Sequence, residues 1–212
     1  MVDEILTEEQ QLEKVRQWWK DNGVSVVLGL VLGLGALAGW RFWQSHQSET
    51  AMSASAAFEQ VVKLSEQADK KAEFVAAAEA LAKDHQGTVY AQFGQLYLAR
   101  ASVNDADLDK AAGLLQAVVN EAAHPALKHT ATLRLARIRL AQGNAEQALQ
   151  LAQISKDDAG TYHGAYAMVR GDALLALNRE AEAHAAFEEA KAAGDVIATH
   201  PELDLKLDVT SL

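Results

Sequence analysis

Residue types that could do chemistry occur in this chain, but their spacing does not assemble a catalytic or metal site. Seven histidines are present, and the closest pair, His124 and His129, is five residues apart, which does not place both on one face of a helix. The sequence contains no H-E-x-x-H, no phosphate-binding glycine loop and no G-x-S-x-G turn. We therefore predict a protein that is not an enzyme, with no metal site and no cofactor.

The charge and the cysteine content exclude further classes of function. The chain has no cysteine, which excludes disulfides, thiolate zinc sites, iron–sulfur clusters and cysteine nucleophiles. It carries 19 Lys plus Arg against 29 Asp plus Glu, so the net charge is −10. A nucleic-acid backbone would be repelled by this field, and we expect no nucleic-acid partner.

Two arginines remain as candidates for recognition rather than catalysis. Arg100 and Arg137 occupy equivalent positions in two copies of a helical repeat described below. A guanidinium can hold a carboxylate through two parallel hydrogen bonds, so the pair could clamp an acidic or backbone group of a ligand. Ion pairing within an acidic domain is the alternative, and the sequence leaves both open.

The elements that must position these side chains begin with a membrane anchor. Residues 22–40 carry no charge, and as a helix they would be about 28 Å long, the thickness of a bilayer's hydrocarbon core. The four tryptophans of the chain flank this run as expected interface anchors, namely Trp18, Trp19, Trp40 and Trp43. The run is too long for a usual signal peptide, so we predict an uncleaved signal anchor.

Positive charges set the expected orientation. Lys14, Arg16 and Lys20 precede the apolar run, and Arg41 follows it. This asymmetry places the N-terminus in the cytoplasm and, in a bacterium, the rest of the chain in the periplasm. The run also contains small residues at a spacing that permits close helix packing, namely Gly29, Gly33, Gly35 and Gly39.

The remaining chain shows a repeat of about 35 residues. An alanine and the residue four positions later recur as Ala77 with Leu81, Ala111 with Leu115, Ala148 with Ala152, and Ala183 with Phe187. A small residue precedes each alanine by twelve positions, at Ser65, Ala99, Ala136 and Gly171. This frame is typical of tetratricopeptide repeats, in which small residues let two helices pack closely. Gly143 and Asn178 fall at the expected turns within two helix pairs.

The predicted fold class is therefore all-α: one N-terminal transmembrane helix followed by a tetratricopeptide-like solenoid of helical hairpins. We expect a cytoplasmic arm at 1–21, a transmembrane anchor at 22–43, a linker at 44–52, a periplasmic repeat domain at 53–194, and a capping segment or tail at 195–212. Alternating apolar residues after Pro201 favour a strand-like cap or a flexible tail. First helices of such repeats line a concave surface, and the frame places seven residues on it: Phe93, Leu96, Arg100, Leu133, Arg137, Met168 and Asp172.

Several phrases of the sequence resemble the YfgM family. They are EEQQLEKVRQWWKDNG at 8–23 followed by the glycine-rich run, HQGTVYAQ at 85–92, DLDKAAGLLQ at 107–116, LRLARIRLAQG at 133–143 and RGDALLAL at 170–177. The resemblance extends over nearly the whole chain and brings no catalytic motif with it.

The resemblance implies an ancillary subunit of the SecYEG translocon in the bacterial inner membrane. It also implies association with a PpiD-like, membrane-anchored periplasmic chaperone, and help in passing translocating polypeptides to periplasmic chaperones. A role in envelope-stress regulation is linked to the same family. A structural scaffold that holds one fixed membrane partner and binds no client is the alternative.

Overall fold

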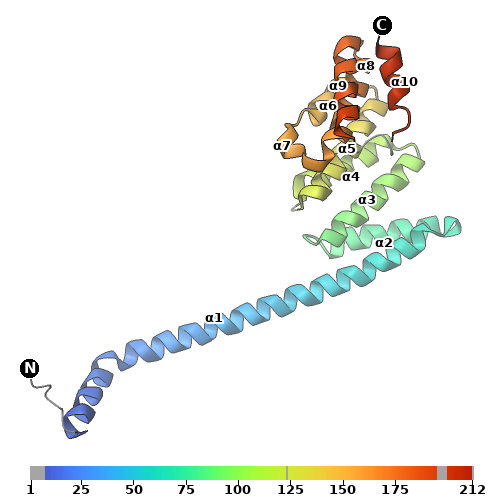
Figure 1. Cartoon of the computed structure of the whole chain (residues 1–212). Helices are drawn as coiled ribbons and strands as arrows, with labels where there is room; N and C mark the ends of the chain where they lie inside the picture. Colours follow the sequence, from blue (N-terminus) through green and yellow to red (C-terminus); the bar gives the residue numbers. More distant parts are fainter. Residues whose placement is uncertain (1–7, 123, 195–199, 212) are drawn as a thin grey trace, which may run out of the picture. The chain divides into compact units, whose positions relative to one another are not determined.

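The chain folds into helices, and every regular element that the described residues form is helical. The computed structural model describes residues 8–122, 124–194 and 200–211, and for residues 8–10 the backbone only. The elements are α1 (Glu8–Ser65), η1 (Ala68–Lys70), α2 (Lys71–Asp84), α3 (Val89–Asn104), α4 (Leu108–Glu121), α5 (Pro125–Ala141), α6 (Ala145–Ala152), α7 (Lys156–Ala159), η2 (Gly160–Tyr162), α8 (His163–Ala176), α9 (Glu180–Ala193) and α10 (Leu203–Thr210) (Figure 1). They form two compact units, Met1–Met52 and Ser53–Leu212.

The first unit is the greater part of α1. Its most apolar 18-residue window has a mean hydropathy of 2.0, and only 6% of that window is buried. Leucines and valines along it face outward, as Leu30 (63% exposed) and Leu32 (65%) illustrate. A helix in water hides such side chains against a core, whereas lipid accepts them. Among the described residues, α1 is therefore the one helix that is long and apolar enough to cross a membrane.

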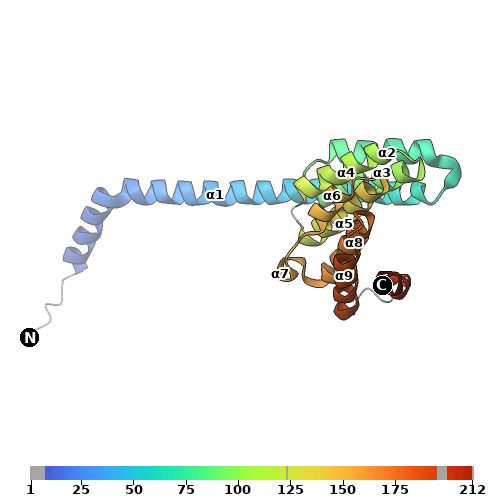
Figure 2. The same ribbon diagram turned by 90° about the horizontal axis from the view of Figure 1, so that it is seen from above.

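The second unit is a stack of helical hairpins. α3 packs on α4, α5 on α6 and α8 on α9, and each hairpin also contacts the next (Figures 1 and 2). Alanines of the repeat frame are buried between the helices: Ala111, Ala148 and Ala183 are fully buried. Larger residues such as Phe187 fill the spaces between them. This is the helical-hairpin solenoid that the repeat frame predicts, and the all-α fold class is confirmed.

The three regular hairpins share one turn geometry. A residue with positive φ ends the first helix of each pair: Ala106 (60°), Gly143 (79°) and Asn178 (58°). The residue after it donates a backbone hydrogen bond to the carbonyl five positions earlier, over 2.8 to 2.9 Å, in Asp107 to Ser102, Asn144 to Arg139, and Arg179 to Leu174. This bond closes a helix end of the Schellman type. The turns predicted at Gly143 and Asn178 are confirmed.

The first pair departs from the expected frame. The end of α1 and α2 form it, around a cluster that contains Val61, Phe74 and Leu81. Ala78 is fully buried there, whereas Ala77 is only half-buried and Ser65 is exposed. The register of the first copy was therefore wrong by one residue at the alanine. Its turn contains the 3-10 helix η1 in place of the shared turn.

Two segments have a different structure from the one expected. Residues 44–52, expected as a linker, are helical and lie within α1. The segment after Pro201 forms the helix α10, so the expectation of a strand-like cap or flexible tail was wrong for 203–210. Its alternating pattern also places Leu203, Leu207 and Thr210 at helical spacing, and these three are buried. α10 packs on α9 and closes the apolar end of the stack.

Candidate protein-binding groove

An open groove lies on the first helices of the repeat unit. It has a volume of about 860 Å³, and its walls come mainly from α3 and α5. Its described lining residues are Phe58, Val89, Tyr90, Phe93, Leu96, Tyr97, Arg100, His124, Ala126, Leu127, Thr130, Arg134 and Tyr162. On α3 and α5 these positions recur every three or four residues, as one face of a helix does.

The floor of the groove is an aromatic cluster centred on Phe58. Its ring centroid lies 5.4 Å from that of Phe93, 5.9 Å from that of Tyr90 and 5.7 Å from that of Tyr97. All four rings are half-buried, so one side of the cluster packs on the domain and the other is open. Rings held in this way add large contact area to a partner while losing little side-chain entropy.

Arginines border the aromatic cluster. Arg100 on α3 and Arg134 on α5 line the groove, and both are exposed. A second hollow of about 290 Å³ continues from it between the same helices, and it is lined by Arg100, Arg134 and Arg137 together. No carboxylate is among the described residues that line either hollow.

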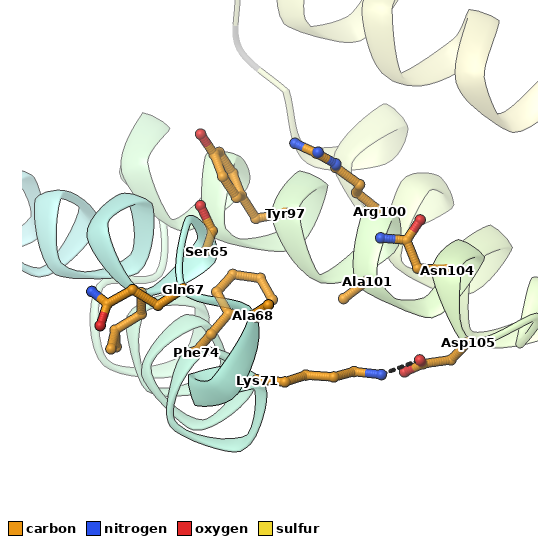
Figure 3. Close-up of a pocket in the computed structure, with 11 residues that line it drawn as sticks. Ser65, Gln67, Ala68, Lys71, Phe74, Tyr97, Arg100, Ala101, Asn104 and Asp105 are labelled. Carbon is orange, nitrogen blue, oxygen red and sulfur yellow. Dashed lines mark hydrogen bonds and ion pairs between the residues drawn. The ribbon is translucent and has the colours of Figure 1, made fainter.

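A third hollow, of about 260 Å³, lies on the other side of α3, toward η1 and α2 (Figure 3). An ion pair between Lys71 and Asp105 borders it. Figure 3 shows the side chains of Tyr97 and Arg100 leaving α3 on the same side, away from that pair. Both residues line this hollow and the groove, so α3 presents them along the ridge that separates the two.

The structure separates the seven residues expected on the concave surface. Phe93, Leu96 and Arg100 line the groove, where Leu96 is 8% exposed. Leu133 (6% exposed) and Met168 (1%) belong to the core between α5, α6 and α8, and this is a correction. On α5, Leu133 is about 100° around the helix from exposed Arg134 and faces the interior, whereas on α8 Met168 lies between the buried residues Ala167 and Val169.

The C-terminal segment engages the other two expected residues. Asp172 on α8 forms an ion pair with Lys206 of α10, and Arg137 lies 3.3 Å from Nε2 of His200 through its Nη2. Lys206 also lies 5.6 Å from the ring centroid of Phe187. Asp172 is therefore paired within the domain. Arg137 is exposed and lines the second hollow.

The repeat frame identified only three of the groove's lining residues, and Phe58 and Arg134 are among those that it missed. Phe58 lies before Ser65, the first residue of the repeat frame, so the frame assigned it no position on the concave surface. Arg134 lies three residues before Arg137 on α5, one helical turn away. The signal that could have found it is the face formed by Leu127, Thr130 and Arg134, spaced three and four residues apart.

In the first unit, the residues expected to contact lipid or another helix are exposed. The four tryptophans are 50 to 63% exposed, and the rings of Trp40 and Trp43 are 5.2 Å apart. A side chain added at Gly29, Gly33, Gly35 or Gly39 would meet nothing within 4 Å. Close helix packing at these glycines and anchoring by the tryptophans stay predictions.

Titratable groups elsewhere in the repeat unit stabilise the fold. Glu189 on α9 pairs with Arg170 and with His163, both on α8, the latter over 3.0 Å. Burial raises the pKa of Tyr166, whose hydroxyl lies 3.1 Å from Nδ1 of His129. Within the described ranges, no three His, Asp or Glu side chains are grouped as a metal site.

Helical hairpins with a shared turn, stacked so that first helices form an open groove, define the class of tetratricopeptide repeat-like proteins. The family model described as "Tetratricopeptide repeat-like domain" matches residues 16–211. Among curated proteins, the chain is 34% identical over 181 residues to the ancillary SecYEG translocon subunit of Escherichia coli, covering 85% of each chain. It is 29% identical over 189 residues to the protein of the same name from Haemophilus influenzae, covering 89% of this chain and 91% of that one.

The third relative, from Aggregatibacter actinomycetemcomitans, has the same name and is 28% identical over 186 residues. No solved structure matches the chain. Since the similarity extends over most of both chains and the repeat-domain model covers nearly all of this one, the chain belongs to the YfgM family.

Proposed function

We propose that this protein is a non-enzymatic ancillary subunit of the SecYEG translocon. The observation that carries the proposal is the similarity over 85% of each chain to a protein of that name. The repeat-like family model matches residues 16–211, which include the apolar run of α1 as well as the repeats. A subunit of a membrane channel needs a membrane segment and a surface for proteins. α1 supplies the first, and the groove on α3 and α5 supplies the second.

In this proposal α1 crosses the bacterial inner membrane once, as an uncleaved signal anchor. The N-terminal arm is cytoplasmic and the repeat unit is periplasmic, in accord with Lys14, Arg16 and Lys20 before the span and Arg41 after it. The anchor holds the groove close to the channel exit. Weak contacts then suffice, because tethering raises the effective concentration of one partner near the other.

The repeat unit binds protein partners and helps to pass translocated polypeptides to periplasmic chaperones, including a PpiD-like chaperone anchored in the same membrane. The groove supports this role because it is open to solvent and its lining is mostly apolar. A transient carrier must release its client quickly, and an open surface releases a bound segment faster than an enclosed cavity does.

The test is co-purification of the tagged full-length chain from mildly solubilised inner membranes. We expect the SecY, SecE and SecG subunits to be recovered with it. A variant in which residues 22–43 are replaced by an unrelated membrane helix serves as the control, because it keeps the repeat unit and the anchoring. Absence of the channel subunits from the unaltered protein would contradict the proposal.

A further inference from the structure

The charge of the groove is opposite to that of the chain as a whole. The protein has a net charge of −10, yet three of its eight arginines, Arg100, Arg134 and Arg137, line the groove and the hollow that continues it. Acidic side chains outnumber basic ones by ten in the sequence, and none of the described lining residues is acidic.

The two groove arginines also have no partner among the residues of the domain that the structure describes. Among the described residues, neither Arg100 nor Arg134 forms an ion pair or a side-chain hydrogen bond, whereas Arg170 and Arg179 pair with Glu189 and Glu182. An exposed guanidinium beside an apolar surface keeps all its donors for a ligand, and it binds a carboxylate through two parallel bonds.

Next to these arginines lies the open side of the aromatic cluster. Phe58, Tyr90 and Phe93 form it together with Tyr97, and Leu127 lies in the opposite wall. A ligand must therefore supply apolar side chains for the cluster and negative charge for its border. An apolar segment without acids would leave the arginines unpaired, and an acidic segment without apolar side chains would leave the rings uncovered.

We infer that the groove selects polypeptide segments in which aromatic or aliphatic side chains are flanked by carboxylates. The inference rests on the proposed function and specifies the partner chemistry of the same surface. The arginines hold the carboxylates while the aromatic cluster takes one or two apolar side chains. Segments flanked by lysines are rejected, because their charge meets that of Arg100 and Arg134.

Fluorescence anisotropy with labelled peptides tests the inference on the full-length chain in nanodiscs of zwitterionic lipid. Three probes share the same phenylalanine and leucine anchors and differ only in flanking Glu, Gln or Lys; a fourth keeps the Glu residues and replaces the anchors with Ser. We expect the Glu-flanked probe with anchors to bind at least about tenfold more tightly than the other three, and its affinity to fall with added salt.

Substitutions assign the effect to the groove. Arg100→Gln combined with Arg134→Gln should lower the affinity for the Glu-flanked probe by about tenfold or more and make that affinity less dependent on salt. Arg179→Gln is the matched control, since it removes one exposed arginine far along the chain, in the turn before α9. Arg100→Glu combined with Arg134→Glu should reverse the preference toward the Lys-flanked probe, a gain that a misfolded variant cannot produce.

Equal binding of all charged probes, binding unchanged by the double Gln substitution, or no binding of any probe would overturn the inference. These results leave the co-purification with SecYEG as a separate readout. If the channel subunits are recovered while the acidic probe shows no preference, the inference fails and the proposed function stands. If they are not recovered, the proposed function fails whatever the peptides do.

Discussion

At the scale of single residues, Gly171 packs directly against the ring of Phe187. A Cβ built at Gly171 would overlap the ring of Phe187, which is fully buried. Gly171→Ala should therefore lower the free energy of unfolding by about 1–3 kcal/mol, since neither the ring nor the backbone has room to move. Thermal unfolding of the full-length chain in detergent, followed by circular dichroism, measures the effect.

Gly113→Ala is the control for that change. Gly113 is exposed on α4, and an added Cβ would meet nothing within 4 Å. Alanine restricts the unfolded chain without straining the helix, so this variant should be more stable by about 0.5–1 kcal/mol. If both substitutions lowered the melting temperature equally, the packing of α8 on α9 described above would be wrong.

Ionisation of Tyr166 should make the stability of the protein depend on pH. Burial raises the pKa of its phenol above the ordinary value of 10.0, so the folded state favours the neutral form. A group with a raised folded pKa stabilises the protein below its unfolded pKa, and that contribution is lost as the pH rises through the folded pKa. Tyr166→Phe removes the titration together with the hydrogen bond to His129.

At pH 7 we expect the Tyr166→Phe variant to be less stable by about 1 kcal/mol, the net contribution of one hydrogen bond. Above pH 10 the difference should shrink, because only the protein with Tyr166 pays for keeping its phenol protonated. Melting temperatures of both proteins from pH 7 to 11 measure it. A difference that stays constant or grows with pH would contradict the burial of this hydroxyl.

At the scale of elements, α10 closes the stack with one face only. Leu207 is 5% exposed and packs in the cluster with Phe187, whereas Leu205, two residues before it, is 65% exposed. Leu207→Ala should cost about 2–4 kcal/mol of stability, and Leu205→Ala should stay within about 0.5 kcal/mol. Urea unfolding of the two variants compares them with the same chemical change. Equal losses would mean that α10 is not docked as described.

The same element shows what could not be predicted from the sequence. Leu203, Leu205, Leu207 and Val209 alternate with polar residues, a pattern typical of a strand. The described residues form no strand with which this segment could pair. As a helix, the segment forms its own backbone hydrogen bonds and buries Leu203 and Leu207. Tertiary context therefore decided between two periods that the residues permit almost equally.

The hairpins were predictable because their signals are local. Gly143 and Asn178 tolerate positive φ, and the buried alanines recur at nearly constant spacing. The first pair was less predictable, since α1 continues through residues 44–52 and the turn at η1 lacks the shared geometry. For the groove, the frame identified Phe93, Leu96 and Arg100. It missed Phe58 and Arg134, whose positions depend on how α1 and α5 rotate against α3.

At the scale of the whole molecule, we expect the two ends of the apolar run to face different compartments. The chain has no cysteine, so single substitutions report cleanly on access. Glu59→Cys should react with a membrane-impermeant maleimide in intact spheroplasts, and Gln17→Cys should react only after lysis; both positions are exposed. The opposite labelling pattern would show the reverse orientation. Labelling of both positions before lysis would contradict the proposal that α1 crosses the membrane.

We propose that this one chain contacts the translocon through its membrane helix and other proteins through its groove. Site-specific photo-crosslinking in intact membranes tests it most directly, with a photoreactive residue placed in turn at Gly33, at Phe93 and, as a control, at exposed Lys83 on α2. We expect the probe at Gly33 to capture channel subunits, the probe at Phe93 to capture a membrane-anchored chaperone or translocating chains, and the probe at Lys83 to capture neither. Capture of the same single unrelated protein at all three positions, or of no protein at any of them, would contradict both proposed contacts.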